Sequence, residues 1–143
     1  MFHVKHLKDI NTYKLLYKLA KISYKNGDIP VSSIIFYEDK IIGKGYNNRQ
    51  KKKEVLGHAE INAIKEAENY LKDWRLNNCV LITTLKPCDM CMEVINASRI
   101  DKVYFILDQG SINYDKNFIM IEEENEFIKK YKHMFDMFFK NLR

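Results

Sequence analysis

Apolar residues recur along the chain with two periods, one typical of amphipathic helices and one typical of strands. Tyrosine, leucine and alanine residues that recur at helical spacing predict a first helix at residues 9–26. The same reasoning predicts further helices at residues 58–71, 87–98 and 122–142. Short β-branched, aromatic or wholly apolar runs predict five strands, at residues 31–37, 40–46, 79–84, 103–107 and 118–121. Residues 47–57 are polar and basic, which indicates a loop.

The order of these elements indicates one α/β domain spanning residues 1–143. Strands alternate with helices after an opening hairpin, whose turn we place at Glu38-Asp39. The chain has 143 residues, a usual size for one domain. It has only five glycines and two prolines, so no linker to a second domain is evident.

Composition narrows the class of protein further. With 46% hydrophobic and 30% charged residues, the chain can bury a sizeable core, which excludes wholesale disorder. No apolar run approaches the ~20 residues of a membrane span, and the first residues lack the apolar stretch of a signal peptide. Three cysteines exclude a disulfide scaffold, and we expect a cytoplasmic setting. The net charge of +5 mildly favours an anionic partner such as nucleic acid.

Two short segments carry the candidate chemistry. His58-Ala59-Glu60 and Pro87-Cys88-Asp89-Met90-Cys91 each follow a predicted loop and open a predicted helix. Cys88 and Cys91 are three residues apart, so both sulfurs lie on one helix face. A helix N-terminus lowers the pKa of a thiol, which favours metal binding. One imidazole and two thiolates make three zinc ligands, which leaves the fourth position of a tetrahedral ion for water.

Glu60 adds a carboxylate beside this predicted zinc site. Zinc lowers the pKa of water from ~16 towards ~7. A carboxylate at this place can take a proton from that water and deliver it to a leaving nitrogen, acting first as a base and then as an acid. This chemistry is hydrolytic deamination, and His-x-Glu followed by Pro-Cys-x-x-Cys is the sequence signature of zinc deaminases.

Other interpretations of these residues fit the pattern less well. A redox Cys-x-x-Cys pair does not call for His-x-Glu at the start of another helix. A closed structural zinc site needs a fourth ligand, and the remaining cysteine, Cys79, lies in an apolar strand and is expected in the core. We expect the other histidines, His3, His6 and His133, at the surface.

On these residues the sequence resembles the cytidine deaminase superfamily, and within it the bacterial tRNA adenosine deaminases. The similarity runs from about Lys25 to Asp108, with a weaker part at the C-terminus. Besides the two segments above, it is carried by Gly27-Asp28-Ile29-Pro30-Val31, Gly43-Lys44-Gly45-Tyr46-Asn47, Trp74-Arg75-Leu76 and Ser98-Arg99-Ile100. The resemblance implies a three-layer α/β/α fold with a five-stranded mixed sheet.

The resemblance also implies a reaction and a set of site residues. An enzyme of this kind converts the wobble adenosine of a tRNA anticodon to inosine, releases ammonia and works as a homodimer. The zinc ligands, one ion per chain, would be His58, Cys88 and Cys91, with Glu60 as the catalytic proton carrier. The implied substrate contacts are Asn47, Ala59 and Pro87. Asn47 has a second interpretation, as a turn residue that ends a strand.

The basic residues of the loop near the expected mouth of the site are candidate RNA contacts: Arg49, Lys51, Lys52 and Lys53. Phe138, Phe139 and Arg143 are further candidates, because the end of the chain resembles the family's C-terminal helix, which helps to hold the RNA. Phosphate contacts suit the lysine-rich loop, although a solvated loop explains it equally well. The same two interpretations apply to the basic residues of the last helix. Its phenylalanines share one helix face, which also suits packing in the core or at a dimer contact.

Four departures from the family pattern keep other functions open. Lys86 replaces a glutamate beside the site, Ser32-Ser33 replaces a Gly-Ala pair, and Ile106-Leu107 replaces small residues. The segment from Asp108 to Asn117 is shorter than the family's and also suits an antiparallel connection, as in the branch that acts on free nucleosides. The alternatives are a deaminase of a free base, nucleoside or nucleotide, of cytidine, deoxycytidylate or guanine type, and a catalytically silent protein that binds zinc and RNA.

Overall fold

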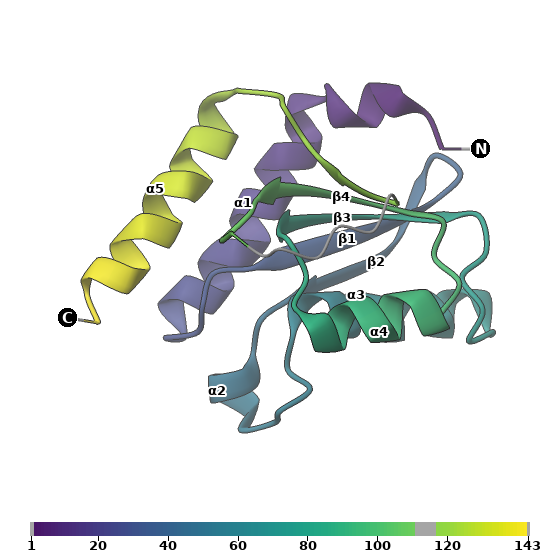
Figure 1. The fold of residues 1–143 in the computed structure, drawn as a ribbon, viewed down its shortest axis with the longest axis horizontal. Coiled ribbons are helices and arrows are strands. Elements are labelled where there is room, and N and C mark those ends of the chain that lie inside the picture. The colour runs from purple at the N-terminus through teal and green to yellow at the C-terminus, as the bar shows by residue number, and fades with distance from the viewer. Residues whose placement is uncertain (1, 111–116, 143) are drawn as a thin grey trace.

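Five strands form one sheet that carries helices on both faces (Figure 1). This computed structural model describes residues 2–110 and 117–142. The strands are β1 (Ser32–Tyr37), β2 (Lys40–Tyr46), β3 (Cys79–Leu85), β4 (Lys102–Leu107) and β5 (Phe118–Met120). The helices are α1 (Ile10–Lys25), α2 (Arg49–Lys52), α3 (Ala59–Leu71), α4 (Asp89–Ala97) and α5 (Glu126–Lys140), and a 3₁₀ helix at Val4–Leu7 precedes them.

The sheet is mixed, in the order β2-β1-β3-β4-β5. Strand β1 runs antiparallel to both β2 and β3, whereas β3, β4 and β5 are mutually parallel. The expected five-stranded mixed sheet is therefore confirmed. β1 and β3 lie in the interior of the sheet, and their residues are almost all buried.

The antiparallel alternative for the last strand is wrong, because Val103 of β4 pairs in parallel register with Phe118 of β5. Length does not prevent this pairing. Because Phe118 pairs with Val103, the connection after Leu107 has to cover the length of four strand residues, about 13 Å. The ten residues between Leu107 and Phe118 can span about 33 Å. A β5 of three residues thus needs no long crossover.

Two apolar layers hold the helices against the sheet. Helices α3 and α4 cover one face, where Ile35, Leu81 and Phe105 pack with Ile64 and Ile95. Helices α1 and α5 cover the opposite face, and Figure 1 shows them side by side on the far side of the sheet from α3 and α4. The molecule is therefore a three-layer α/β/α fold, as the resemblance implied.

Helix α3 lies unusually close to the edge strand β2. A Cβ atom at Gly45 would come within 2.2 Å of the Ala59 carbonyl oxygen and 2.6 Å of the Ala63 nitrogen. Only glycine fits this approach, because the obstacles are backbone atoms. The contact fixes the start of α3, and with it His58, against the sheet.

The predicted loop at residues 47–57 contains one further element, the short helix α2. Its four residues are polar and basic, so no apolar period marked it in the sequence. The buried carboxylate of Asp28 holds its start, accepting hydrogen bonds from the backbone of Gln50 at 2.7 Å and of Lys51 at 3.3 Å.

The last helix begins later than predicted, at Glu126 rather than Glu122. Asn125 sets this start, because its side chain accepts hydrogen bonds from the backbone of Phe127 and Ile128, both at 3.0 Å. An asparagine cap of this kind satisfies the first free N–H groups of a helix.

The side chains outside the candidate site follow the expectations with one exception. Cys79 is fully buried in the core, and His3 and His133 are exposed. The prediction for His6 is wrong: its ring is half-buried, stacks on Phe36 at 4.5 Å between centroids and hydrogen-bonds Asp39 at 2.9 Å. The 3₁₀ helix brings His6 onto the sheet, and no apolar period marked that helix either.

None of the helices in residues 2–110 and 117–142 combines the length and the apolar character that crossing a membrane requires.

Candidate metal centre and active site

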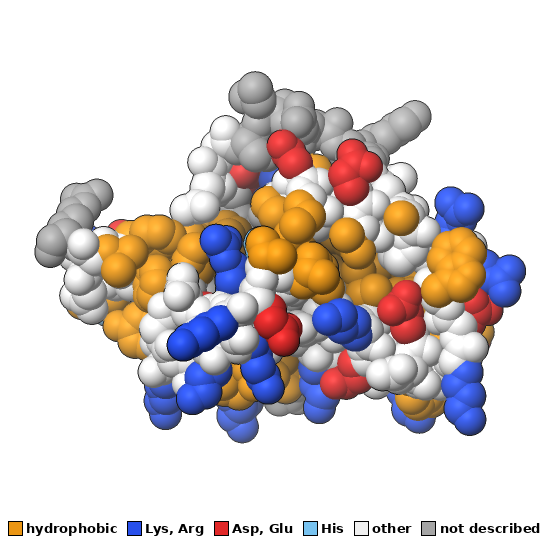
Figure 2. All heavy atoms as spheres, turned by 90° about the horizontal axis from the view of Figure 1, so that it is seen from below, with side chains coloured by type: hydrophobic (Ala, Val, Ile, Leu, Met, Phe, Trp, Pro, Cys, Tyr) orange, Lys and Arg blue, Asp and Glu red, His pale blue; other side chains and the backbone are white. Residues whose placement is uncertain are grey.

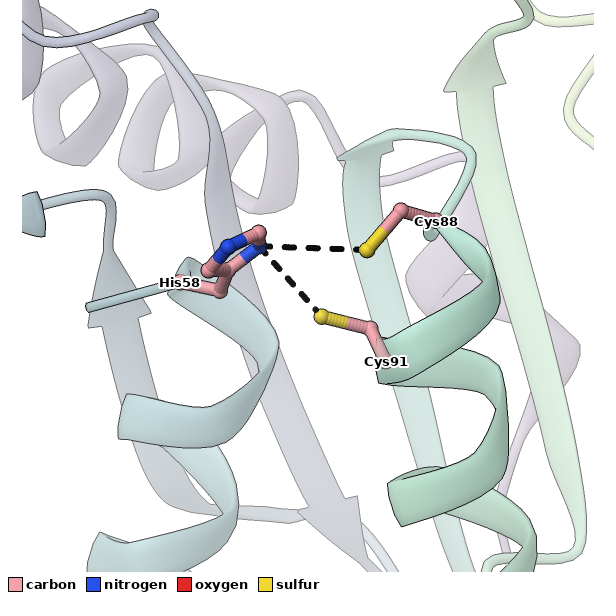
Figure 3. Close-up of side chains that lie close together, drawn as sticks. All are labelled: His58, Cys88 and Cys91. Atoms are coloured by element: carbon pink, nitrogen blue, oxygen red, sulfur yellow. Dashed lines mark hydrogen bonds between the residues drawn. The ribbon is translucent and has the colours of Figure 1, made fainter. Parts of the chain in front are cut away.

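Three side chains meet where the starts of α3 and α4 lie next to each other (Figure 3). His58 is the residue immediately before α3, and Cys88 is the residue immediately before α4. Cys91 lies in the first turn of α4 and is buried. In Figure 3 the imidazole and both sulfurs point towards one another across the gap between the two helices. The sequence prediction of this group is therefore correct in its geometry.

The three ligand atoms fit one tetrahedral metal ion. His58 Nδ1 lies 3.5 Å from the sulfur of Cys91 and 4.0 Å from that of Cys88, and all three atoms lie within 4.8 Å of one another. Ordinary zinc–sulfur and zinc–nitrogen bonds at tetrahedral angles place the ligand atoms about 3.6–3.8 Å apart. Within the described residues no fourth histidine, cysteine or carboxylate joins the group. Such a donor set suits zinc with an open position rather than a closed structural site.

The two cysteines of the group differ in acidity. The pKa of the Cys88 thiol is lowered to about 5, chiefly by a hydrogen bond from Cys91, with further help from backbone N–H groups at the start of α4 and from His58. The pKa of Cys91 is raised, because it donates that hydrogen bond and is buried. Cys88 is therefore a thiolate at neutral pH and ready to bind a cation.

Glu60 lies in the first turn of α3 and is only 4% exposed. Burial raises the pKa of its carboxyl to about 7, and the nearby negative charge of Cys88 adds to the effect. A carboxyl group whose pKa lies near neutrality can both accept and return a proton. Its position beside the three ligands thus matches the role of proton carrier.

A cavity of about 380 Å³ opens over these residues, a volume that suits a small organic molecule. His58, Glu60 and Cys88 line it together with Asn47 and Pro87. A second cavity, of about 450 Å³, adjoins it and shares Asn47 and His58. The two cavities make a continuous candidate binding region around the metal group.

The side chain of Asn47 bridges the two walls of this region. Its Oδ1 accepts a hydrogen bond from the Ala59 backbone at 2.8 Å, and its Nδ2 donates to the Ile29 carbonyl at 3.1 Å. Asn47 directly follows the end of strand β2 and lines both cavities, so its position is compatible with either interpretation. Ala59 is fully buried, whereas Pro87 lines the cavity beside the metal group.

The candidate RNA contacts separate into two groups. Arg49, Phe138 and Phe139 line the second cavity. The lysines that follow Arg49 are exposed and line neither cavity, and Arg143 lies outside the described residues.

The basic residues of α5 lie on a solvated face. Three of its four lysines form ion pairs with acidic neighbours: Lys130 with Glu126 at 4.0 Å, Lys132 with Glu124 at 3.0 Å, and Lys140 with Asp136 at 3.1 Å. These pairs favour the interpretation of this face as solvated over that of a phosphate-binding patch.

Sequence reasoning gave no role to two residues that shape the site. Lys86, noted only as a departure, is 6% exposed and lines the cavity beside the metal group. Asp28, quoted only as part of the resemblance, is 3% exposed, lines the second cavity and holds α2. The signal for Asp28 was an acidic residue two positions before Pro30, which on its own also describes an ordinary turn.

The chain is similar to several known proteins. Residues 7–107 match the cytidine and deoxycytidylate deaminase zinc-binding region. A tRNA-specific adenosine deaminase from Buchnera aphidicola (subspecies Schizaphis graminum) is 34% identical, and the match covers 98% of this chain and 99% of that protein.

Solved structures share the fold. One, from studies of A-to-I editing by tRNA:A34 deaminases at the wobble position of transfer RNA, matches with a TM-score of 0.67 and 22% identity, over 75% of this chain and 94% of that one. Guanine deaminase from Bacillus subtilis matches with a TM-score of 0.63 and 30% identity, over 76% of this chain and 66% of that one. With the metal group and its adjacent carboxylate in place, these matches show that the chain belongs to the zinc-dependent cytidine and deoxycytidylate deaminase family, among the relatives named tRNA-specific adenosine deaminases.

Proposed function

We propose that the protein is a zinc-dependent hydrolase that deaminates adenosine to inosine at the wobble position of a tRNA anticodon. The observation that carries this proposal is the triangle of His58, Cys88 and Cys91 beside the buried carboxyl of Glu60. His58, Cys88 and Glu60 line one cavity. The choice of tRNA as substrate is supported by the relatives of that name, which match the chain over nearly its whole length.

The reaction replaces the amino group at C6 of adenine by oxygen from water and releases ammonia. A zinc ion held by His58, Cys88 and Cys91 would supply Lewis-acid activation of that water. Water loses two protons in this reaction, and Glu60 can carry both, one to ring atom N1 and one to the amine nitrogen that departs as ammonia. The raised pKa of Glu60 suits both transfers, because neither protonation state is strongly disfavoured near pH 7.

Asn47 and the second cavity orient the RNA. The carboxamide of Asn47 sits at the junction of the two cavities, where it meets the nucleoside that enters the site. In the second cavity, Phe138 and Phe139 offer aromatic faces for a neighbouring base, and Arg49 offers a cation for a phosphate. A flipped base in one cavity and its neighbour in the next is the arrangement that base-modifying enzymes require.

The enzyme works as a homodimer in the cytoplasm. An apolar area on the face that carries α3 and α4 supports the dimer. Figure 2 shows this face from below, with hydrophobic side chains gathered on it among scattered basic ones. Val55 and Leu56, just before α3, are 68% and 46% exposed. Met90 and Val94 lie half-buried on α4.

A free purine base is the second candidate substrate. It is favoured by the guanine deaminase that shares the fold at 30% identity. The volume of the cavity beside the metal group accommodates a free base as well as a flipped one.

A panel of substrates distinguishes these functions. The zinc-loaded protein is incubated with an anticodon stem-loop that has adenosine at the wobble position, with the same stem-loop carrying adenosine only at other positions, and with guanine, cytidine and deoxycytidylate. We expect ammonia release and inosine with the first substrate alone. Turnover of guanine or a free nucleoside, with no turnover of the stem-loop, would show that the substrate is a free base or nucleoside and not tRNA. Stem-loop binding without turnover of any substrate would indicate a silent RNA-binding protein.

A further inference from the structure

A three-residue segment, Ile29-Pro30-Val31, runs beside the two cavities, and we call it the 29–31 segment. Ile29 lines both cavities, and Val31 lines the cavity beside the metal group. The segment connects the end of α1 to the start of β1. It belongs to no helix or strand, so neither a helical nor a sheet hydrogen-bond pattern fixes it.

The carbonyl groups of this segment accept hydrogen bonds from two sides. Asn47 donates two of these bonds, one from its backbone N–H to the Val31 carbonyl at 3.0 Å and one from its Nδ2 to the Ile29 carbonyl at 3.1 Å. The carbonyl between them, that of Pro30, accepts a hydrogen bond of 2.8 Å from the hydroxyl of Tyr131 on α5. The segment therefore lies between Asn47 on one side and α5 on the other.

The side chain of Tyr131 is buried in the core behind the site. It is 1% exposed and packs among Ala20, Met134 and Phe135, where α5 meets α1. Burial raises the pKa of its hydroxyl, which therefore stays protonated and remains a donor at any physiological pH. Proline has no N–H, so its carbonyl is the only backbone group that Pro30 can use to anchor the segment.

From this arrangement we infer that Tyr131 is a positioning residue for the reaction. Its hydroxyl fixes the 29–31 segment, and through that segment it orients the carboxamide of Asn47 in the cavity. Asn47 in turn accepts a hydrogen bond from the backbone N–H of Ala59, the residue between His58 and Glu60. A helix remote in sequence thus sets the geometry of the substrate contact. The inference rests on the proposed function in so far as Asn47 contacts the substrate.

Tyr131→Phe isolates this role, because it removes the hydroxyl and keeps the ring that packs in the core. The chain offers a matched control in Tyr13, which is also 1% exposed and also donates its hydroxyl to a backbone carbonyl, that of Leu7. Tyr13 lines neither cavity. Tyr13→Phe therefore reports what the loss of one buried tyrosine hydroxyl does away from the site.

Both variants are compared with the wild type, each zinc-loaded, in steady-state deamination of the wobble-adenosine stem-loop. We expect Tyr131→Phe to raise KM by roughly three- to tenfold, the factor for one lost hydrogen bond, with kcat within about twofold. Tyr13→Phe should leave both constants unchanged while losing a similar amount of thermal stability. An unchanged KM in Tyr131→Phe, or an equal rise in Tyr13→Phe, would overturn the inference.

Hydrogen–deuterium exchange gives a readout that does not need turnover. In Tyr131→Phe, the backbone amides of Asn47 and Ala59 should exchange faster than in the wild type, and in Tyr13→Phe they should not. If the wild type deaminates none of the substrates, the proposed function fails, and faster exchange at these two amides in Tyr131→Phe alone still supports the positioning role. Equal exchange in all three proteins contradicts it.

Discussion

At the scale of single residues, burial and neighbours give the three cysteines different chemistry. Cys79 is fully buried in β3, and burial raises the pKa of its thiol to about 11. Cys88 lies at a helix start, and the pKa of its thiol is lowered to about 5, chiefly by the hydrogen bond from Cys91. One of these cysteines is therefore an inert part of the core, and the other is a ready ligand.

This difference predicts the pattern of alkylation by iodoacetamide. At pH 7 the pH lies above the pKa of Cys88, so in the zinc-free protein this side chain is a thiolate and should react first. Its reactivity should persist as the pH falls, decrease to half near pH 5 and disappear only below that pH, whereas an ordinary thiol is already almost fully protonated at pH 7. Cys79 should stay unmodified in the folded protein. Mass spectrometry of tryptic peptides measures both.

Zinc should protect Cys88 in the same experiment, because a metal-bound sulfur is no longer a free nucleophile. Cys79 serves as the internal control. Modification of Cys88 at the same rate with and without zinc would show that the sulfur does not bind the ion.

At the scale of elements, the packing of α3 on β2 positions the histidine ligand. Gly45→Ala should lower the free energy of unfolding by about 1–3 kcal/mol, because the added Cβ meets backbone atoms of α3 that cannot move aside. Lys44→Ala, at the exposed neighbouring position on the same strand, should change it by less than about 0.5 kcal/mol. Urea denaturation measures both, and equal stability of the two variants would refute the argument.

The elements that bury an apolar face could be predicted from sequence, because burial imposes a period. Helix α3 begins one residue from its predicted start, and β3 ends one residue beyond its predicted end. The short helix α2 and the late start of α5 could not be predicted in this way. Both starts depend on backbone hydrogen bonds that a single side chain accepts, Asp28 for α2 and Asn125 for α5. The partner of Asp28 is 22 residues away and comes near only in the fold, whereas Asn125 caps its own helix, a local signal that an apolar period does not carry.

The metal group was predictable because its members lie in two short motifs, His-x-Glu and Pro-Cys-x-x-Cys, that each open a predicted helix after a loop. The link from Tyr131 to Pro30 was not, since 101 residues separate them and Tyr131 belongs to no motif.

At the scale of the whole molecule, the metal joins the starts of α3 and α4, so its removal should loosen both. A ligand present at a hundred times its Kd adds about 2.7 kcal/mol to stability. We expect a chelator to lower the melting temperature by roughly 5–10 °C, and added zinc to restore it. Differential scanning fluorimetry measures the shift.

Two cysteine variants control this experiment. Cys88→Ala should abolish the response to the chelator, whereas Cys79→Ala should lower stability and keep the response. A melting temperature that the chelator leaves unchanged in the wild type would contradict the metal site.

The central claim is that a metal-bound triangle and one buried carboxylate deaminate adenosine in tRNA. Its most direct test compares the wild type and Glu60→Gln, both carrying one zinc ion per chain, for the rate of inosine formation in a wobble-adenosine stem-loop. The account predicts inosine with the wild type and a rate lower by at least about 100-fold with the variant, at equal zinc content. A zinc-loaded wild type that forms no inosine, or a Glu60→Gln protein that forms it at the wild-type rate, would contradict the account.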